Sequence, residues 1–169
     1  MNGRRLTTRS IVLATGARPL VPKIPGLEEV DYLTSDNIWN LRELPKRLLV
    51  LGGGPIGCEL AQCFARFGSQ VTQVEMAPRL MPREDADAAN EVTQQFEQEG
   101  IKVAAGHKAL RIEKDENGDV LICEFKGTEV RFGFDKILLA LGRVANTEGF
   151  GLKELGISLQ TNGTIDANE

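Results

Sequence analysis

The stretch "RLLVLGGGPIGCELA", residues 47–61, decides the fold. Arg47 is followed by a fully apolar run, which is typical of a strand buried on both faces of a parallel sheet. Gly52, Gly54 and Gly57 then form the pattern G-x-G-x-x-G, and apolar residues at helical spacing follow. A strand, a glycine-rich turn and a helix in this order predict the first β-α unit of a dinucleotide-binding fold.

Each glycine of this turn has a physical reason in dinucleotide binding. Gly52 allows the tight turn, Gly54 leaves room for a pyrophosphate to approach the backbone, and Gly57 lets the helix pack closely on the strand. The first turn of the helix offers unpaired N–H groups and a partial positive charge to the phosphates. A glycine-rich turn that binds nothing is the alternative.

The next apolar run, residues 70–75, ends in Glu75, close to the spacing of about 20 residues expected for an acid that binds ribose. A carboxylate here accepts hydrogen bonds from the 2′-OH and repels a 2′-phosphate, so the sequence favours NAD over NADP. Arg79 is the counter-argument, because an arginine near this strand end could meet a 2′-phosphate.

Cys58 and Cys63 form a C-x4-C pattern, which raises the question of a redox-active disulfide. Both fall inside the expected helix, where residues five apart have Cα atoms about 8.7 Å from each other. A disulfide needs a Cα separation below roughly 7 Å. We therefore interpret both cysteines as small buried residues that pack the helix on the sheet.

The rest of the chain predicts a Rossmann-like α/β domain with a central parallel sheet, flanking helices and a three-stranded antiparallel β-meander. Turn signals at residues 117–118 and 126–127 indicate the meander. The periodicity and turn residues predict further strands at 11–14, 70–75, 101–105 and 135–142, and helices at 35–44, 56–67, 85–99 and 152–155.

Composition narrows the class of partner and compartment. A formal net charge of −4 over 169 residues argues against nucleic acid as the main partner. No apolar run reaches the roughly 18 residues of a membrane span. Three cysteines make no disulfide framework, so a reducing cytoplasm is the expected location. His107 is the only histidine and has no cysteine cluster beside it, so we expect no metal site.

Four motifs carry a family resemblance: "VLATGARP" (12–19), "LLVLGGGPIGCELA" (48–61), "VTQVEMAPRLMP" (71–82) and "ILLALGRVANT" (137–147). With these motifs in this order, the chain resembles the pyridine nucleotide-disulfide oxidoreductases. These are FAD-dependent enzymes, and the chain is most similar to the dihydrolipoamide dehydrogenase and mercuric-reductase-like branch. The resemblance covers nearly the whole chain.

The resemblance implies contacts with both cofactors and no catalytic residue in this chain. The implied NAD pyrophosphate loop contains Gly52, Gly54, Pro55, Ile56 and Gly57. Glu75 and Met76 are the implied contacts of the ribose. Ala109 is the implied contact of the adenine, and Gly142 that of the nicotinamide. The implied FAD contacts are Thr15, Gly16 and Arg143. Glu59 matches a helix glutamate that pairs with a lysine beside the flavin; a solvent-facing acid stabilised by the helix dipole is the alternative.

The resemblance also implies a division of the chain within a larger parent enzyme. Residues 1–44 would be a flap of the FAD domain with a connector, 45–146 the NAD(H)-binding domain, and 147–169 the start of the return into the FAD domain. In the parent, expected to be a homodimer, NADH bound here would pass hydride to the flavin, whereas this chain alone would be inactive. A non-catalytic NAD-binding or sensing module and a self-contained NAD-dependent dehydrogenase remain as alternatives.

Overall fold

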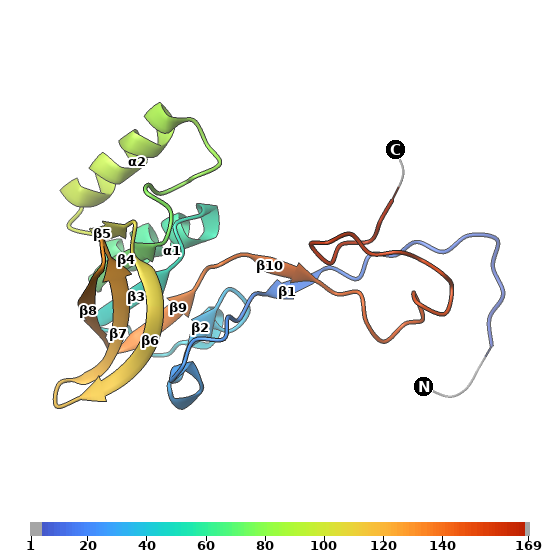
Figure 1. The fold of residues 1–169 in the computed structure, drawn as a ribbon, viewed down its shortest axis with the longest axis horizontal. Coiled ribbons are helices and arrows are strands. Elements are labelled where there is room, and N and C mark those ends of the chain that lie inside the picture. The colour runs from blue at the N-terminus through green and yellow to red at the C-terminus, as the bar shows by residue number, and fades with distance from the viewer. Residues whose placement is uncertain (1–4, 168–169) are drawn as a thin grey trace. The chain divides into compact units, whose positions relative to one another are not determined.

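The computed structural model describes residues 5–167 (Figure 1), which fall into two compact units. One unit comprises residues 19–143, and the other comprises the described residues on either side of it, 5–18 and 144–167. Among the described residues, no helix has the length and apolar character needed to cross a membrane.

The unit formed by residues 19–143 is built around a parallel sheet of five strands in the order β2-β9-β3-β4-β5. The bounds of these strands are β2 Leu33–Thr34, β3 Arg47–Leu51, β4 Gln70–Glu75, β5 Lys102–Ala105 and β9 Lys136–Leu139. Strand β3 pairs with β4 and β9, so the predicted apolar run after Arg47 lies in the middle of the sheet. The predicted parallel sheet is confirmed.

Two helices cover one face of this sheet. Helix α1 (Pro55–Phe67) follows β3, and α2 (Ala86–Gln98) follows β4. Their buried side chains, among them Ala61 and Phe96, share a core with Leu48 and Val50 of β3. Asp85 is the N-cap residue of α2 and Gly68 the C-cap residue of α1, so the predicted helix ends are close to the observed ones.

A cluster of polar side chains joins the two helices. Glu99, at the C-cap of α2, accepts hydrogen bonds from Arg66 (2.7 and 2.9 Å), Gln62 (2.9 Å) and Gln95 (2.8 Å). Hydrogen bonds from Arg66 and then Gln95 lower the pKa of Glu99 to about 2. The Glu99 carboxyl group therefore stays ionised at pH values well below the ordinary pKa of a glutamate.

An antiparallel sheet, β6-β7-β8, covers the other face of the parallel sheet. Its strands are β6 Lys108–Asp115, β7 Gly118–Phe125 and β8 Thr128–Phe134. The turn between β7 and β8 contains Lys126 and Gly127, both with positive φ (51° and 79°), as in the mirror-image turns that suit a hairpin. The predicted meander is confirmed, and it packs Leu121, Phe132 and Phe134 against the sheet.

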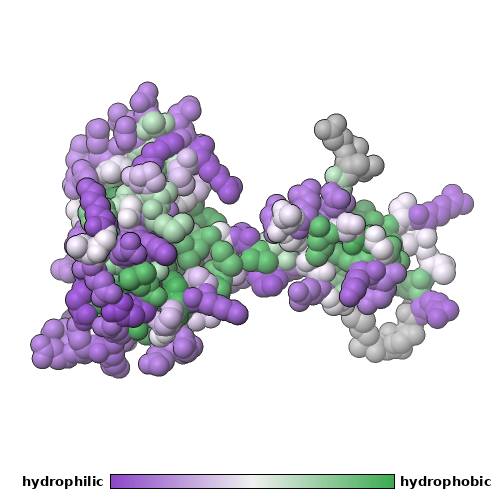
Figure 2. Space-filling view, viewed as in Figure 1, coloured by the Kyte–Doolittle hydropathy of each residue, from purple (hydrophilic) through white to green (hydrophobic). Residues whose placement is uncertain are grey.

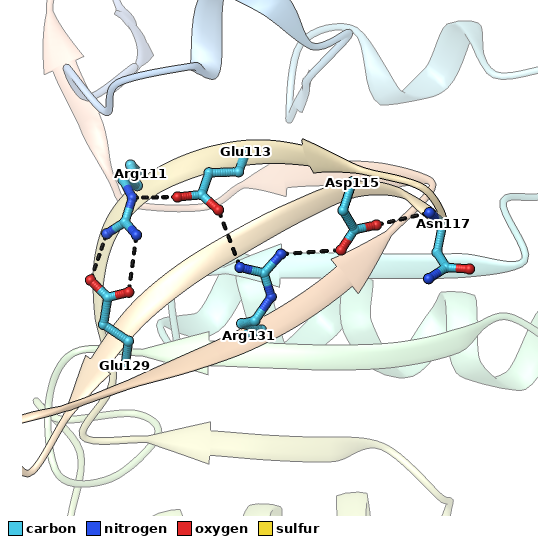
Figure 3. A network of polar contacts seen from close by, with 6 residues as sticks. All are labelled: Arg111, Glu113, Asp115, Asn117, Glu129 and Arg131. Carbon is cyan, nitrogen blue, oxygen red and sulfur yellow. Dashed lines mark hydrogen bonds and ion pairs between the residues drawn. The ribbon is translucent and has the colours of Figure 1, made fainter.

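The outer face of the meander carries a ladder of ion pairs (Figure 3), which we call the charge ladder. Its members are Arg111, Glu113, Asp115, Glu129 and Arg131. Arg111 binds both oxygens of Glu129 (2.7 and 2.9 Å) and also Glu113 (2.7 Å). Arg131 bridges the other oxygen of Glu113 and Asp115, at 3.1 Å each.

Two aliphatic residues lie on the same face as the charge ladder. In the strand register, Ile122 is opposite both Arg111 and Arg131, and Val120 is opposite Glu113. Both are buried, yet neither belongs to the two main cores. The stems of the paired arginines therefore shield apolar surface that would otherwise face water.

The second unit contains little regular structure. Residues 17–18 and 144–145 belong to a two-stranded sheet, β1 (Ala17–Pro19) with β10 (Arg143–Ala145). Thr15 and Asn146 are joined by two hydrogen bonds, of 2.7 and 3.0 Å. Apolar side chains such as Val12 and Leu155 are exposed in this unit, and Figure 2 shows green patches on its visible face.

Three predicted elements are wrong. Residues 11–14 form no strand, because a strand needs a neighbouring strand and these exposed residues have none among the described part of the chain. Residues 35–44 contain only a 3-10 turn, Ile38–Asn40, and the Asn37 side chain accepts from the Thr34 N–H (2.6 Å) rather than capping a helix. Residues 152–155 form turns, a conformation that suits a segment with four glycines between 149 and 163.

Candidate functional site

The glycine turn, residues 52–57, lies at the carboxyl end of β3. Gly52 has a φ of 118°, and a Cβ added there would collide with the carbonyl oxygen of Ala140. A Cβ on Gly57 would collide with the carbonyl oxygen of Gly52. Gly54 differs, because a Cβ there would meet no atom within 4 Å. Gly52 and Gly57 therefore need glycine for the fold, whereas Gly54 leaves open space above the turn.

Gly53 is a constrained position that the sequence pattern missed. A Cβ there would lie 2.8 Å from a methyl carbon of Leu80 and 2.9 Å from Cγ of Glu75. The G-x-G-x-x-G motif treats this position as variable, so the motif does not mark it. The run of three consecutive glycines was the signal that could have identified it.

Helix α1 begins at the turn with its N–H groups uncovered. Gly54 is the N-cap and has no side-chain cap, and Pro55 is the first helical residue. Proline has no N–H, so the donors at this end are those of Gly54, Ile56 and Gly57. Within residues 5–167 these three donors have no acceptor. The site therefore presents free donors and a positive helix end beside the open space at Gly54.

Glu75, the last residue of β4, reaches back to the glycine turn. One carboxylate oxygen accepts from the Gly53 N–H (2.6 Å), and the other accepts from the Ala77 N–H (2.6 Å). The side chain is half-buried, and the next residue, Met76, is exposed. Because each carboxylate oxygen has two lone pairs, Glu75 keeps capacity for further donors at the edge of the turn.

Arg79 folds into its own loop. Its Nη2 donates to the carbonyl oxygens of Pro82 (3.2 Å) and Glu84 (2.8 Å). Its Nη1 is buried and has no acceptor within the described residues. The guanidinium group thus braces residues 79–84 in this structure.

The turn between β5 and β6 lies against the strand end that carries Glu75. The His107 N–H donates to the Glu75 carbonyl (2.9 Å), and the Gly106 N–H donates to that of Ala77 (2.8 Å). The His107 ring stacks on Phe125, with centroids 4.2 Å apart. Ala109, two residues further, is half-buried in β6. Among the described residues, no group of three or more His, Cys, Asp or Glu side chains is arranged to hold a metal ion.

The segment after β9 brings two more predicted residues to the same edge of the sheet. The Ala140 N–H donates to the Leu51 carbonyl (2.8 Å), just before the glycine turn. Gly142 follows with a φ of 110°, and its carbonyl accepts from the Leu20 N–H (2.9 Å). Arg143 donates to the hydroxyl of Ser35 (3.2 Å) and forms an ion pair with Asp36 (3.6 Å).

The remaining predicted residues lie elsewhere. Glu59 follows Cys58 in α1 and is exposed. Thr15 and Gly16 belong to the unit formed by the chain ends, where Gly16 has a φ of 69° and its carbonyl accepts from the Asn146 N–H (3.0 Å). The structure therefore collects the glycine turn, Glu75 and Gly142 at the carboxyl ends of the strands, and it describes Thr15 and Gly16 within the other unit.

Cys58 and Cys63 are both free thiols in α1. Cys58 is buried, and burial raises the pKa of its thiol. Cys63 is exposed, so our interpretation that both pack on the sheet is wrong for Cys63. The cause is the 140° or so between positions five apart on a helix, which turns the second thiol towards solvent.

Comparison with known proteins gives a consistent result. A family model described as "Pyridine nucleotide-disulphide oxidoreductase" matches residues 1–169. The chain is 35% identical over 169 residues to a mercuric reductase of Staphylococcus aureus, covering 100% of this chain and 31% of that protein. It is 38% identical over 171 residues to a dihydrolipoyl dehydrogenase of Thermus scotoductus, covering 99% and 37%.

A solved structure supports the same fold. The HOCl-induced flavoprotein disulfide reductase RclA from Escherichia coli superposes with a TM-score of 0.78 at 34% identity, over 91% of this chain and 35% of that one. The chain thus spans about a third of the length of the relatives that it matches. The predicted Rossmann-like architecture is confirmed.

Proposed function

The chain belongs to the pyridine nucleotide-disulphide oxidoreductase family, and on that premise we propose that residues 45–146 form an NAD(H)-binding domain of an FAD-dependent member. Residues 1–44 and 147–169 would then contribute to the FAD domain. In the whole enzyme, NADH bound here would supply a hydride to the flavin. The residues of this chain would bind, orient and shield the dinucleotide, as proteins do for cofactors that carry the chemistry.

The uncovered start of α1 is the observation that carries this proposal. The N–H groups of Gly54, Ile56 and Gly57 have no acceptor within the described residues, and the space above Gly54 is open. A pyrophosphate is an anion with several acceptor oxygens, and it fits such a helix end. Glu75 lies at the edge of the same turn, where spare lone pairs of its carboxylate could accept ribose hydroxyls.

The same geometry favours NAD over NADP. The Glu75 carboxylate would repel a 2′-phosphate placed at the strand end. Arg79, the residue that could have offset this repulsion, already donates to two backbone carbonyls of its own loop. We therefore propose NAD as the preferred coenzyme of this site.

The test is titration of the purified chain with NAD, NADH and NADP, with binding measured by calorimetry and by the rise in Tm. We expect NADH and NAD to bind and NADP to bind at least about tenfold more weakly. Glu75→Arg should reverse this order, because a guanidinium pairs with a 2′-phosphate. Glu91→Gln in α2 is the matched control for a lost surface acid and should keep the order.

Two outcomes would contradict the proposal. Absence of any effect of NAD or NADH on Tm and in the calorimeter would remove the binding site. Oxidation of NADH by the chain in the absence of flavin would instead indicate a self-contained dehydrogenase. Added FAD with an artificial electron acceptor provides the parallel assay.

A further inference from the structure

Gln73 is a fully buried polar residue whose partners on the two adjacent strands are apolar. It lies in β4 between Val50 of β3 and Val103 of β5, and its side chain has 0% exposure. Its Nε2 lies 3.0 Å from the Gly52 carbonyl oxygen. Because that oxygen can only accept, the amide nitrogen must be the atom facing it. Oε1 is left buried with no donor among the described residues.

Gln73 and Glu75 hold the two ends of one peptide group. They are two positions apart in β4, so their side chains lie on the same face of the sheet. Gln73 donates to the Gly52 carbonyl, and Glu75 accepts from the Gly53 N–H (2.6 Å). These two groups belong to the same peptide bond. Neither glycine has a side chain of its own to restrict this peptide group. The two contacts from β4 therefore fix its orientation.

The next peptide group is held in the same way. The Gly53 carbonyl accepts from the Met81 N–H (2.7 Å), and the Cys58 thiol also reaches it (3.5 Å). A trans peptide directs its carbonyl and its N–H to opposite sides. With the carbonyl held against the loop, the Gly54 N–H must point away from it. Two successive peptide groups are thus fixed before the free donors begin.

Gln73 affects stability in two opposing ways. A buried amide costs free energy unless each polar atom is paired, and here Oε1 is not. An apolar residue of similar size would avoid that cost, but it would leave the Gly52 carbonyl without the donor that Gln73 supplies. We propose that Gln73 is a positioning residue for the dinucleotide: by holding the Gly52 carbonyl, it keeps the glycine turn in the conformation that aims its N–H groups at a pyrophosphate. This inference rests on the proposed function and deepens it.

The experiment compares Gln73→Leu with the unaltered chain in two measurements. Amide hydrogen exchange by NMR should show faster exchange of the Gly53 N–H, because its peptide group loses one of its two holders. The Kd for NADH should rise about fivefold, the effect of one neutral hydrogen bond. The Tm should change little, because removal of the unpaired Oε1 offsets the donor that the Gly52 carbonyl loses. Gln73→Met is the second variant should branching of leucine disturb the packing.

Val71→Ala provides the matched control. Val71 is buried on the same face of β4, two positions before Gln73, and it packs in the core beneath α1. Its truncation should lower the Tm but leave the Gly53 exchange rate and the Kd for NADH unchanged. This pattern is the reverse of the one expected for Gln73→Leu, so general loosening of the α1 packing is distinguished from loss of positioning.

The outcomes separate this inference from the proposed function. If the unaltered chain binds NADH and Gln73→Leu binds it equally well, the inference is overturned and the proposed function stands. An equal Gly53 exchange rate in both proteins would overturn it as well. If the unaltered chain binds no dinucleotide, the proposed function fails and this inference fails with it.

Discussion

The glycine turn and the charge ladder are both rich in polar groups, but they use them in opposite ways. At the turn, the N–H groups of Gly54, Ile56 and Gly57 have no acceptor within the described residues. In the charge ladder, each guanidinium group pairs with two carboxylates, and successive ion pairs have one residue in common (Figure 3). A polar region thus indicates ligand binding when its donors are left without acceptors, and structural support when its charged groups are paired with one another.

The electrostatics of the ladder follow the same distinction. Hydrogen bonds from Arg111 and then Arg131 lower the pKa of Glu113, and the Asn117 N–H followed by Arg131 lowers that of Asp115. These carboxylates are stabilised as anions by neighbours already present. They therefore have little left to offer a ligand.

Gly52→Ala should have the largest effect, because it disrupts the glycine turn itself. In Gly52→Ala the new methyl group collides with the Ala140 carbonyl, at a φ of 118° that L-residues rarely adopt. We expect the free energy of unfolding to fall by about 3 kcal/mol, and binding of NADH to weaken about 100-fold or more. Urea denaturation and calorimetry measure the two effects. Normal stability would show that the turn is not as constrained as its geometry indicates.

Gly54→Ala should separate binding from folding. Gly54 has an ordinary φ of −78°, and a Cβ there meets no atom within 4 Å. The free energy of unfolding should therefore change by less than about 0.5 kcal/mol. The Kd for NADH should rise about tenfold or more, because the methyl group occupies the space assigned to the pyrophosphate. Unchanged affinity would place the phosphates elsewhere.

A second closed cluster, around Glu99, gives a test by pH. The pKa of Glu99 is lowered from 4.5 to about 2 in the folded chain. The contribution of the ionised Glu99 to stability is therefore fully present above pH 4.5 and is lost as the pH falls towards 2. Glu99→Gln should therefore be less stable than the unaltered chain at neutral pH, with the difference in Tm disappearing near pH 2. The Kd for NADH at neutral pH should not change. Glu91→Gln, also in α2, is the control and should show no such convergence.

The smallest effects are expected in the charge ladder. Arg111→Met keeps an apolar stem over Ile122 and loses only exposed ion pairs, so its Tm should fall by about 2 °C or less. Arg111→Ala removes the stem as well and should have the lower Tm of the two, because Ile122 becomes exposed. Both variants should bind NADH normally. Equal Tm values for the two variants would show that the stem shields nothing.

The sequence was sufficient for the elements whose cause is local. The apolar run of β3, the glycine turn and the periodicity of α1 follow directly from residues 47–67, and the strand over 70–75 was predicted with its observed bounds. Residues 11–14 have the same apolar character but no neighbouring strand in the described chain, and they stay extended and exposed. Strand formation depends on pairing, which a local pattern does not contain.

The candidate site was predicted in part for a related reason. The spacing of Glu75 from the turn follows a known pattern, but the hold of Gln73 on Gly52 depends on which strand faces the turn. The charge ladder likewise depends on the register of β6, β7 and β8, which brings Arg111 opposite Ile122. Gly53 needed the positions of Leu80 and Glu75 to become visible as a constraint. These features arise from tertiary neighbours rather than from sequence spacing.

The short outer strands of the parallel sheet have a consequence for self-association. Strand β2 contains only two residues and β5 only four, so each sheet margin offers few unpaired backbone groups. Sheets grow by recruiting a further chain along such margins, and a short margin gives an incoming strand little to bind. The parallel sheet is therefore protected against strand-by-strand growth at its two margins, even though its strands are rich in aliphatic residues.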